Sequence, residues 1–379
     1  MPRFRTVLAA ALTLLLSVSL VAHANAYDDW LRWAELGPYQ PVVEDWDAIY
    51  QRALQEPPLL VYAHTSRIFS AVEELVAEYP GLSVEALDMP GQEIIERVVR
   101  EWDAGRRDIG VAFMALPWLQ HDLLLPRQAV TRYVPRELEA QIDPSDTEPL
   151  LKHRFSASGW MYNDANFDQA PWDNIWELTT EEFRNRVVIS DIQGGATTPT
   201  YFTGMIQFSD EMERLHEEFF SEPITLHTTT ANAGEEFIRR LLQNDMRVLT
   251  SSREVAEALT NSTGPFAGMT VYSRLREVEQ GTYRFAIDAV NSPVVVAYHY
   301  ISIGSFTQSP NTAKLLIRRL TSQEGGRWFW GENFPVNSSY TLIEPFKMTL
   351  DDFELAWRID ADTATDVMDR LMDYWQLWR

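Results

Sequence analysis

Residues 59–87 of the chain read LLVYAHTSRIFSAVEELVAEYPGLSVEAL, and this stretch decides the fold. The apolar run 59–63 predicts a buried strand, and the polar segment 64–67 predicts a loop. A helix is predicted next, because apolar side chains recur at the spacing of one helix face: Phe69, Val72, Leu75, Val76 and Tyr79. Pro80-Gly81 ends that helix, and Leu82 to Leu87 predicts a second strand.

The alternation of strand and helix continues along the chain. Met89-Pro90-Gly91-Gln92 leads into a helix, and a third strand is predicted over 108–114. Further strands are predicted at 187–189 and 293–303, with helices from Tyr201 onward, over 237–242 and over 313–320. Such alternation is typical of βαβ units, so the sequence predicts an α/β fold with a largely parallel sheet.

Composition limits the classes of function. The chain has 379 residues, of which 45% are hydrophobic and 12% aromatic, so it can bury a sizeable core in roughly two domains. Its 55 acidic and 32 basic side chains give a net charge of -23, which argues against a protein that binds nucleic acid through its phosphates. It has no cysteine, which excludes disulfides, thiolate metal sites, thiol nucleophiles and a lipidated N-terminal cysteine.

The N-terminal residues have the pattern of an export signal. Arg3 and Arg5 precede an apolar run from Val7 to Val21, and small residues follow around Ala24 and Ala26. The run is shorter than the roughly 20 residues of a membrane-spanning helix, so we interpret residues 1–26 as a cleaved signal peptide, with an uncleaved anchor as the alternative. Cleavage removes two arginines and leaves a charge of -25. We expect an exported protein without membrane insertion.

The last 35 residues are rich in aromatic side chains, including Trp357, Trp375 and Trp378. They are predicted to form amphipathic helices that pack against the body of the protein, with docking to a partner as the alternative.

Four segments carry a resemblance to a known family. They are Leu60–Ala63 with 78–84 (EYPGLSV); 104–111 (AGRRDIGV); Gly159–Asn163 (GWMYN) with 172–178 and 186–191 (RVVISD); and 292–304 with 311–325, followed by Phe334-Pro335-Val336. In this order and spacing, the chain resembles the type II periplasmic solute-binding proteins of ABC importers, in the branch that includes ferric-ion and phosphonate binders. The resemblance implies two α/β lobes with the ligand in a cleft between them. It divides the mature chain into a first lobe (27–158), a second lobe (159–290) and a return to the first lobe with the C-terminal helices (291–379).

The fold that the resemblance implies directs helix N-termini at the ligand, and their free N–H groups and positive dipole favour an anionic or oxygen-rich solute. Two loops have suitable hydroxyls and glycines, a third forms a possible rim, and aromatic side chains nearby could stack on a ligand. The predicted ligand-binding residues are Thr65, Ser66, Arg67, Gly91, Gln92, Tyr162, Gly195, Ala196, Thr197, Thr198, Tyr201 and Tyr298. Ordinary capping and turn formation is the alternative role for each loop.

Iron is the alternative ligand. Family members that bind ferric ion carry an adjacent tyrosine pair in the second lobe, but the corresponding stretch 243–254 has no tyrosine. Arg247, Arg253 and the hydroxyls of 250–252 suit an organic anion better. Tyr298 and Tyr300 are separated by His299 on a predicted strand, and we expect the two tyrosines to point to opposite faces. No metal or cofactor is predicted.

The sequence has no nucleophile elbow, dinucleotide-binding glycine motif, phosphate-binding Walker loop or zinc-binding HExxH motif. We therefore predict a non-enzymatic, monomeric periplasmic receptor that captures a small solute and presents it to an inner-membrane permease. A secreted enzyme on the same scaffold and a ligand sensor that signals to a membrane partner are the alternatives.

Overall fold

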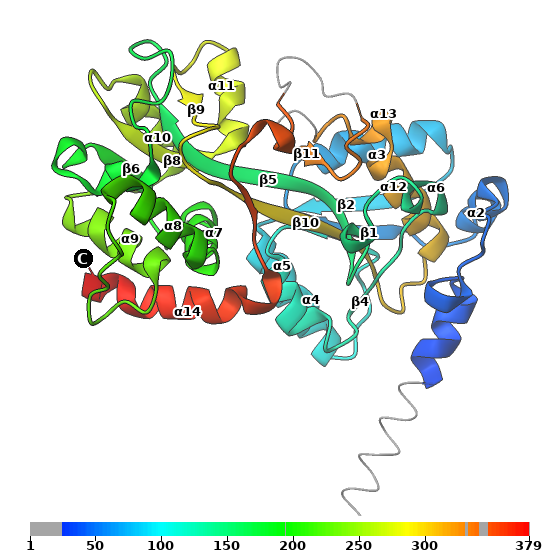
Figure 1. Ribbon diagram of the computed structural model, residues 1–379. Helices are drawn as coiled ribbons and strands as arrows, with labels where there is room; N and C mark the ends of the chain where they lie inside the picture. Colours follow the sequence, from blue (N-terminus) through cyan, green and yellow to red (C-terminus); the bar gives the residue numbers. More distant parts are fainter. Residues whose placement is uncertain (1–24, 194, 330–332, 341–347, 379) are drawn as a thin grey trace, which may run out of the picture. The chain divides into compact units, whose positions relative to one another are not determined.

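The computed structural model describes residues 25–193, 195–329, 333–340 and 348–378 (Figure 1). The predicted signal peptide therefore lies outside the described residues up to position 24. The chain forms two compact units. Unit 1 comprises the described residues up to Met114 with Leu124–Leu151 and Ile301–Ser322, and unit 2 comprises Ala115–Leu123, Lys152–Tyr300 and the described residues from Gln323 onward. The α/β fold class is confirmed, because each unit contains parallel strands covered by helices.

Unit 1 is built on the segment that opens the sequence analysis. The parallel strands have the order β2–β1–β3, with β1 (Leu59–Ala63) paired to β2 (Val84–Asp88) and β3 (Val111–Met114). Residues 25–33 are helical. The other elements are α2 (Trp46–Ala53), α3 (Arg67–Glu78), α4 (Gly91–Asp103), β4 (Val130–Thr131), α6 (Arg136–Glu139) and α12 (Pro310–Thr321).

The helix α3 turns a different face to the core than its sequence pattern predicts. Ile68, Ala71 and Leu75 are fully buried, whereas the side chain of Phe69 is 45% exposed. The prediction that Phe69 belongs to the apolar face was therefore wrong, because the buried stripe is shifted by one residue toward Ile68.

Unit 2 contains the longest strands, β5 (Leu151–Tyr162) and β10 (Val294–Gly304). From β10, the order of hydrogen-bonded neighbours in the sheet is β10–β5–β8–β6–β7. In this order β6 (Val187–Ser190) is parallel to β7 (Arg247–Leu249) and to β8 (Ala267–Val271). The last residues of β10, from Ile301 onward, belong to unit 1 and pair with β4. The short strands are β9 (Ala286–Ile287), β11 (Phe334–Pro335) and β12 (Ala356–Arg358).

Unit 2 has a core of large aromatic side chains that includes Trp160, Trp172, Trp176 and Phe237, and helices α7 (Thr197–Gln207), α8 (Ser209–Phe220), α9 (Ala233–Gln243) and α14 (Ala361–Trp378) contribute to it. The other α-helices of this unit are α5 (Pro117–Leu119), α10 (Ser252–Thr260), α11 (Leu275–Glu279) and α13 (Gln323–Gly326).

The C-terminal segment completes unit 2. Helix α14 lies along α7 and α9 (Figure 1), and its side chains Leu371, Trp375 and Trp378 belong to the buried core of this unit. Packing of the C-terminal helix against the body is therefore confirmed. Trp357 lies on strand β12, not on a helix as predicted, because residues 356–358 pair with the start of β10. The described residues from Gln323 onward thus lie with unit 2, whereas the sequence analysis placed them, as part of 291–379, with the first lobe.

Among the described residues, we find no helix that combines the length and the apolar character needed to cross a bilayer.

Candidate functional site

The parallel strands of unit 1 bring two of the predicted loops to one sheet edge. Ala63 at the end of β1 pairs with Asp88 at the end of β2, and its carbonyl oxygen accepts a hydrogen bond from the Met89 N–H at 3.0 Å. The segment Thr65–Arg67, which leads into α3, and the segment Gly91-Gln92, which begins α4, therefore follow neighbouring strands at their carboxyl ends. In open α/β sheets this edge is where ligands bind.

The two loops differ in the hydrogen bonds that they leave open. In the first turn of α3, Thr65 accepts from the N–H of Arg67 through its hydroxyl (3.4 Å) and from the N–H of Ile68 through its carbonyl (3.2 Å). Helix α4 begins after Pro90 without a side-chain cap, and within the described residues the N–H groups of Gly91 and Gln92 have no partner. Before α3, the N–H groups of Thr65 and Ser66 also have no partner among the described residues. Both starts can therefore donate hydrogen bonds to an anion, and in α4 the open N–H groups belong to the helix itself.

Unit 2 repeats this arrangement at the end of β6. Helix α7 begins at Thr197 without a side-chain cap, after the exposed residues Gly195 and Ala196. The N–H groups of Thr197 and Thr198 have no hydrogen-bond partner in the part of the chain that the structure describes. A Cβ placed on Gly195 would meet no atom within 4 Å, so the backbone here is open to close approach. The start of α7 can therefore donate hydrogen bonds to oxygen atoms of a solute.

Two of the predicted residues on α7 face inward. Thr198 is fully buried, and its hydroxyl donates to the carbonyl oxygen of Ser190 at 2.9 Å. Tyr201 is also fully buried, its hydroxyl donates to the carbonyl oxygen of Pro293 at 3.0 Å, and burial holds its pKa well above the usual value. These side chains anchor α7 to the sheet. Tyr162 is buried as well, with its ring edge-on to Trp172.

Tyr298 and Tyr300 lie on the same face of β10, with ring centres 5.1 Å apart. The expectation that they point to opposite faces was wrong, because side chains two residues apart on a strand share a face. Burial raises the pKa of Tyr298 to about 12. Sequence reasoning missed the neighbour His121. Its Nε2 lies 2.8 Å from the hydroxyl of Tyr300, and its Nδ1 lies 2.6 Å from a carboxylate oxygen of Asp362. His121 and Asp362 are 241 residues apart, and no local motif connects them.

The polar groups after β7, which the sequence analysis favoured for an organic anion, already bind each other. The hydroxyl of Ser251 caps α10 by accepting from the N–H of Glu254, whose carboxylate accepts from the N–H and hydroxyl of Thr250. Arg253 pairs with Glu257 at 3.1 Å. This segment therefore forms a capped helix start rather than an open anion site.

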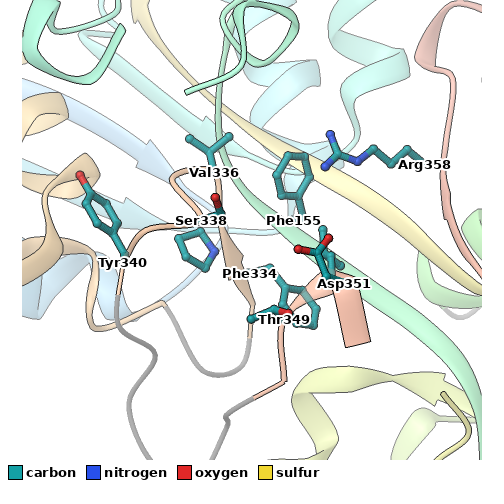
Figure 2. A pocket seen from close by; sticks show the side chains of 10 residues that line it. Phe155, Phe334, Val336, Ser338, Tyr340, Thr349, Asp351 and Arg358 are labelled. Carbon is teal, nitrogen blue, oxygen red and sulfur yellow. The ribbon is translucent and has the colours of Figure 1, made fainter. Parts of the chain in front are cut away.

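Unit 2 also contains a pocket of about 100 Å³ (Figure 2). One wall carries Arg358 of β12, with its guanidinium 4.6 Å from the ring centre of Phe155 on β5. The lining consists of Phe155, Phe334, Pro335, Val336, Ser338, Tyr340, Thr349, Leu350, Asp351 and Arg358. None of the predicted ligand-binding residues lines it. Within the sequence analysis, only the motif Phe334-Pro335-Val336 falls in this pocket, and there it supports the family resemblance and does not predict a pocket.

No family model and no curated protein matches the chain, but solved structures do. Iron-bound HitA from Pseudomonas aeruginosa has a TM-score of 0.64 at 12% identity, covering 83% of this chain and 98% of that chain. The substrate binding protein of an ABC transporter from Agrobacterium tumefaciens has a TM-score of 0.60 at 17% identity, with 85% and 94% covered. The periplasmic binding protein AfuA from Actinobacillus pleuropneumoniae, with fructose-6-phosphate bound, has a TM-score of 0.61 at 14% identity, with 84% and 99% covered. The fold that the sequence resemblance implied is therefore confirmed.

Proposed function

We propose that the protein is the periplasmic solute-binding component of an ABC importer. In this proposal the N-terminal segment directs export, and the mature protein closes on a small anionic or oxygen-rich solute without changing it chemically. It then delivers the solute to an inner-membrane permease. The fold supports this proposal, because the solved structures with the same fold include the substrate binding protein of an ABC transporter and a periplasmic binding protein.

The observation that carries the proposal is the pair of helix starts with open N–H groups, at α4 and α7. Helices α2, α9 and α10 begin with side-chain caps from Asp45, Asn232 and Ser251. Helices α3, α4, α7, α8 and α12 begin without one. In α3 the first N–H binds the hydroxyl of Thr65, in α12 the carboxylate of Glu56 accepts from the first turn, and α8 follows α7 directly. Helices α4 and α7 each follow the carboxyl end of a parallel strand, and their first N–H groups have no partner among the described residues. Unpaired N–H groups and the positive helix dipole at these two starts attract negative charge.

The first test is a thermal-shift screen of the wild-type protein against organic anions, phosphonates, sugar phosphates, amino acids, polyamines and metal ions. Binding to the folded state raises the unfolding temperature, so we expect at least one anion to raise it. If no solute of the panel does so, the receptor proposal fails.

Three variants then test the site with the solute found. Gly91→Pro removes one free N–H, and the extended conformation of Pro90 (ψ 142°) accepts a following proline. We expect this change and Thr197→Ala to weaken binding about tenfold, and Glu93→Gln, which removes an acid from the first turn of α4, to strengthen it. Val42→Ala, at an 87% exposed side chain, is the control. Unchanged affinity in all three variants would discard these helix starts as the site.

Ferric ion is the second candidate solute, and the cluster around β10 favours it. Two phenols and the carboxylate of Asp362 supply the oxygen donors that a hard cation prefers, and the imidazole of His121 adds a nitrogen donor that iron also binds. Tyr298 and Tyr300 are 8% and 1% exposed, so uptake requires movement of the surrounding side chains.

Titration with ferric citrate tests this candidate through the visible absorption of an iron–phenolate bond. The band is expected in the wild type, is expected to disappear in Tyr298→Phe/Tyr300→Phe, and is expected to persist in the control Tyr374→Phe. A wild-type protein that develops no band leaves the anion as the solute.

A further inference from the structure

A second surface of unit 1 has the composition of a carbohydrate site. It is a groove of about 630 Å³, bounded by the end of the helix at residues 25–33, by the end of α2 and by the segment that leads into α12. One wall carries Trp33, whose side chain is 56% exposed. An exposed tryptophan is costly to leave in water, and in a groove it offers a flat face for a ligand.

The charged side chains in the groove are all paired within the chain. Arg52 binds the carboxylate of Glu35 at 2.9 Å and the amide oxygen of Asn311 at 3.2 Å. The carboxylate of Glu56 accepts four hydrogen bonds, two from Asn311 and two from Thr312, at 2.7 to 2.9 Å. The charge of Arg52 is balanced by Glu35, whereas the donors to Glu56 are neutral and leave its negative charge in place. An anionic ligand would therefore be repelled, and a cationic ligand would have to compete with the four hydrogen bonds of that carboxylate.

The groups that stay open are neutral. Among the described residues, the side-chain amides of Gln51 and Gln55 and the indole N–H of Trp33 have no hydrogen-bond partner, although all three line the groove. Each amide offers two donor hydrogens and an acceptor oxygen in one plane, which matches pairs of neighbouring hydroxyls on a sugar ring. The carbon–hydrogen face of the same ring can pack on the indole.

The residues that present Trp33 are held firmly. Ala34 and Leu36 are buried, and the carbonyl oxygen of Glu35 accepts from the ammonium of the buried Lys314 at 3.2 Å. The carboxylate of Glu35 binds Arg52, which ties this turn to α2. The exposed indole thus sits on a fixed support, so little ordering is needed when a ligand binds.

We propose that this groove binds an uncharged oligosaccharide, with Trp33 as the stacking platform and Gln51 and Gln55 as the hydroxyl partners. This site is independent of the helix starts proposed for solute capture. A protein partner is the competing occupant, but the paired charges and free amides favour hydroxyl groups over a charged protein surface.

Calorimetric titration of the full chain with maltohexaose, cellohexaose and chitohexaose tests the proposal. At least one of these neutral sugars is expected to bind at micromolar to millimolar concentration. Trp33→Ala and Gln51→Ala/Gln55→Ala should each weaken that binding about tenfold or more. Val42→Ala and Thr197→Ala should not change it, and because Trp33, Gln51 and Gln55 are all exposed, the unfolding temperatures should stay the same.

Two results would overturn the proposal. One is that none of the three sugars binds at millimolar concentration, and the other is that Trp33→Ala binds as tightly as the wild type. If no sugar binds but Trp33→Ala abolishes cross-linking to an inner-membrane permease, the groove is a protein-docking surface instead. Failure of solute capture with intact sugar binding would reject only the proposed receptor function.

Discussion

The carboxylate of Glu236 on α9 is 1% exposed and is bound by Arg239 at 2.6 Å and Arg240 at 2.8 Å. Burial alone raises its pKa, but hydrogen bonds from the two arginines, the N–H of His227 and the hydroxyl of Thr230 outweigh burial and lower the pKa to about 2. A depressed pKa contributes stability above the unfolded value of 4.5, and that stability is lost as the pH falls from 4.5 toward 2.

We therefore expect Glu236→Gln to lower the free energy of unfolding by about 3 kcal/mol at pH 7, because two partly buried guanidinium groups lose their buried counter-ion. Between pH 4.5 and pH 2 the variant should lose less stability than the wild type. Urea unfolding across this range measures both effects. Glu211→Gln is the matched control, because Glu211 also pairs with an arginine but is 47% exposed, and such pairs contribute at most about 1 kcal/mol. Parallel acid profiles for wild type and Glu236→Gln would contradict this assignment.

Lys314 on α12 is 1% exposed, and burial lowers its pKa from 10.5 to about 8. The folded protein releases this proton more easily than the unfolded chain, so the contribution of Lys314 to stability rises as the pH increases from 8 toward 10.5. The stability of the wild type relative to Lys314→Met should therefore rise by about 1 kcal/mol per pH unit above pH 8. Chemical unfolding of both proteins between pH 7 and pH 9.5 measures the difference, and a constant difference would contradict it.

Sequence reasoning predicted the proposed loops better than the direction of their side chains. The order of strand, hydroxyl or glycine and helix is a local pattern, and both loops do lead into helices: α4 begins at Gly91, and α7 begins at Thr197, four residues before the predicted start at Tyr201. The direction of a side chain depends on contacts far along the chain. Tyr201 is buried because its hydroxyl reaches Pro293, 92 residues away, and no spacing near residue 201 reveals that contact.

At the scale of elements, the approach of α9 to α7 depends on Gly234. A Cβ built on Gly234 would lie 2.2 Å from the carbonyl oxygen of Met205, which is a backbone atom of α7 and cannot rotate away. Gly234→Ala should therefore force the two helices apart and lower the free energy of unfolding of unit 2 by about 3 kcal/mol, more than the helix propensity of alanine restores. Gly195→Ala is the control, because a Cβ there meets open space. Equal stability of the two variants would show that the helices can separate without cost.

Element boundaries could be predicted where the pattern is local. β1 runs from Leu59 to Ala63 as predicted, since a short apolar run between a proline pair and a polar loop predicts a buried strand. The third strand begins at Val111, three residues after the predicted start, and the exposed ion pair of Arg106 and Asp108 lies before it. The role of residues 115–123 could not be predicted, because their place in unit 2 comes from contacts with α14, such as the one between His121 and Asp362.

At the scale of the whole molecule, the acid excess opposes folding. The net charge of -23 means that the acidic side chains repel one another in the compact state. Surface ion pairs such as Arg214 with Glu218 at 2.9 Å contribute little to the stability of the fold. Glu73, Glu213 and Asp373 are exposed and, within the described residues, have no ion-pair partner. Neutralising all three with Glu73→Gln/Glu213→Gln/Asp373→Asn should raise the unfolding temperature by about 2 °C at low ionic strength.

The gain should shrink when sodium chloride is raised to about 0.15 M, where the Debye length is about 8 Å and distant charges no longer interact. The wild type itself should become more stable over the same range, because screening weakens the many long-range repulsions more than the short ion pairs. Calorimetric scans of both proteins at several salt concentrations make the comparison. If salt instead lowers the unfolding temperature of the wild type, the local pairs outweigh the global repulsion, and the acidity of this chain stabilises its fold through contacts rather than straining it.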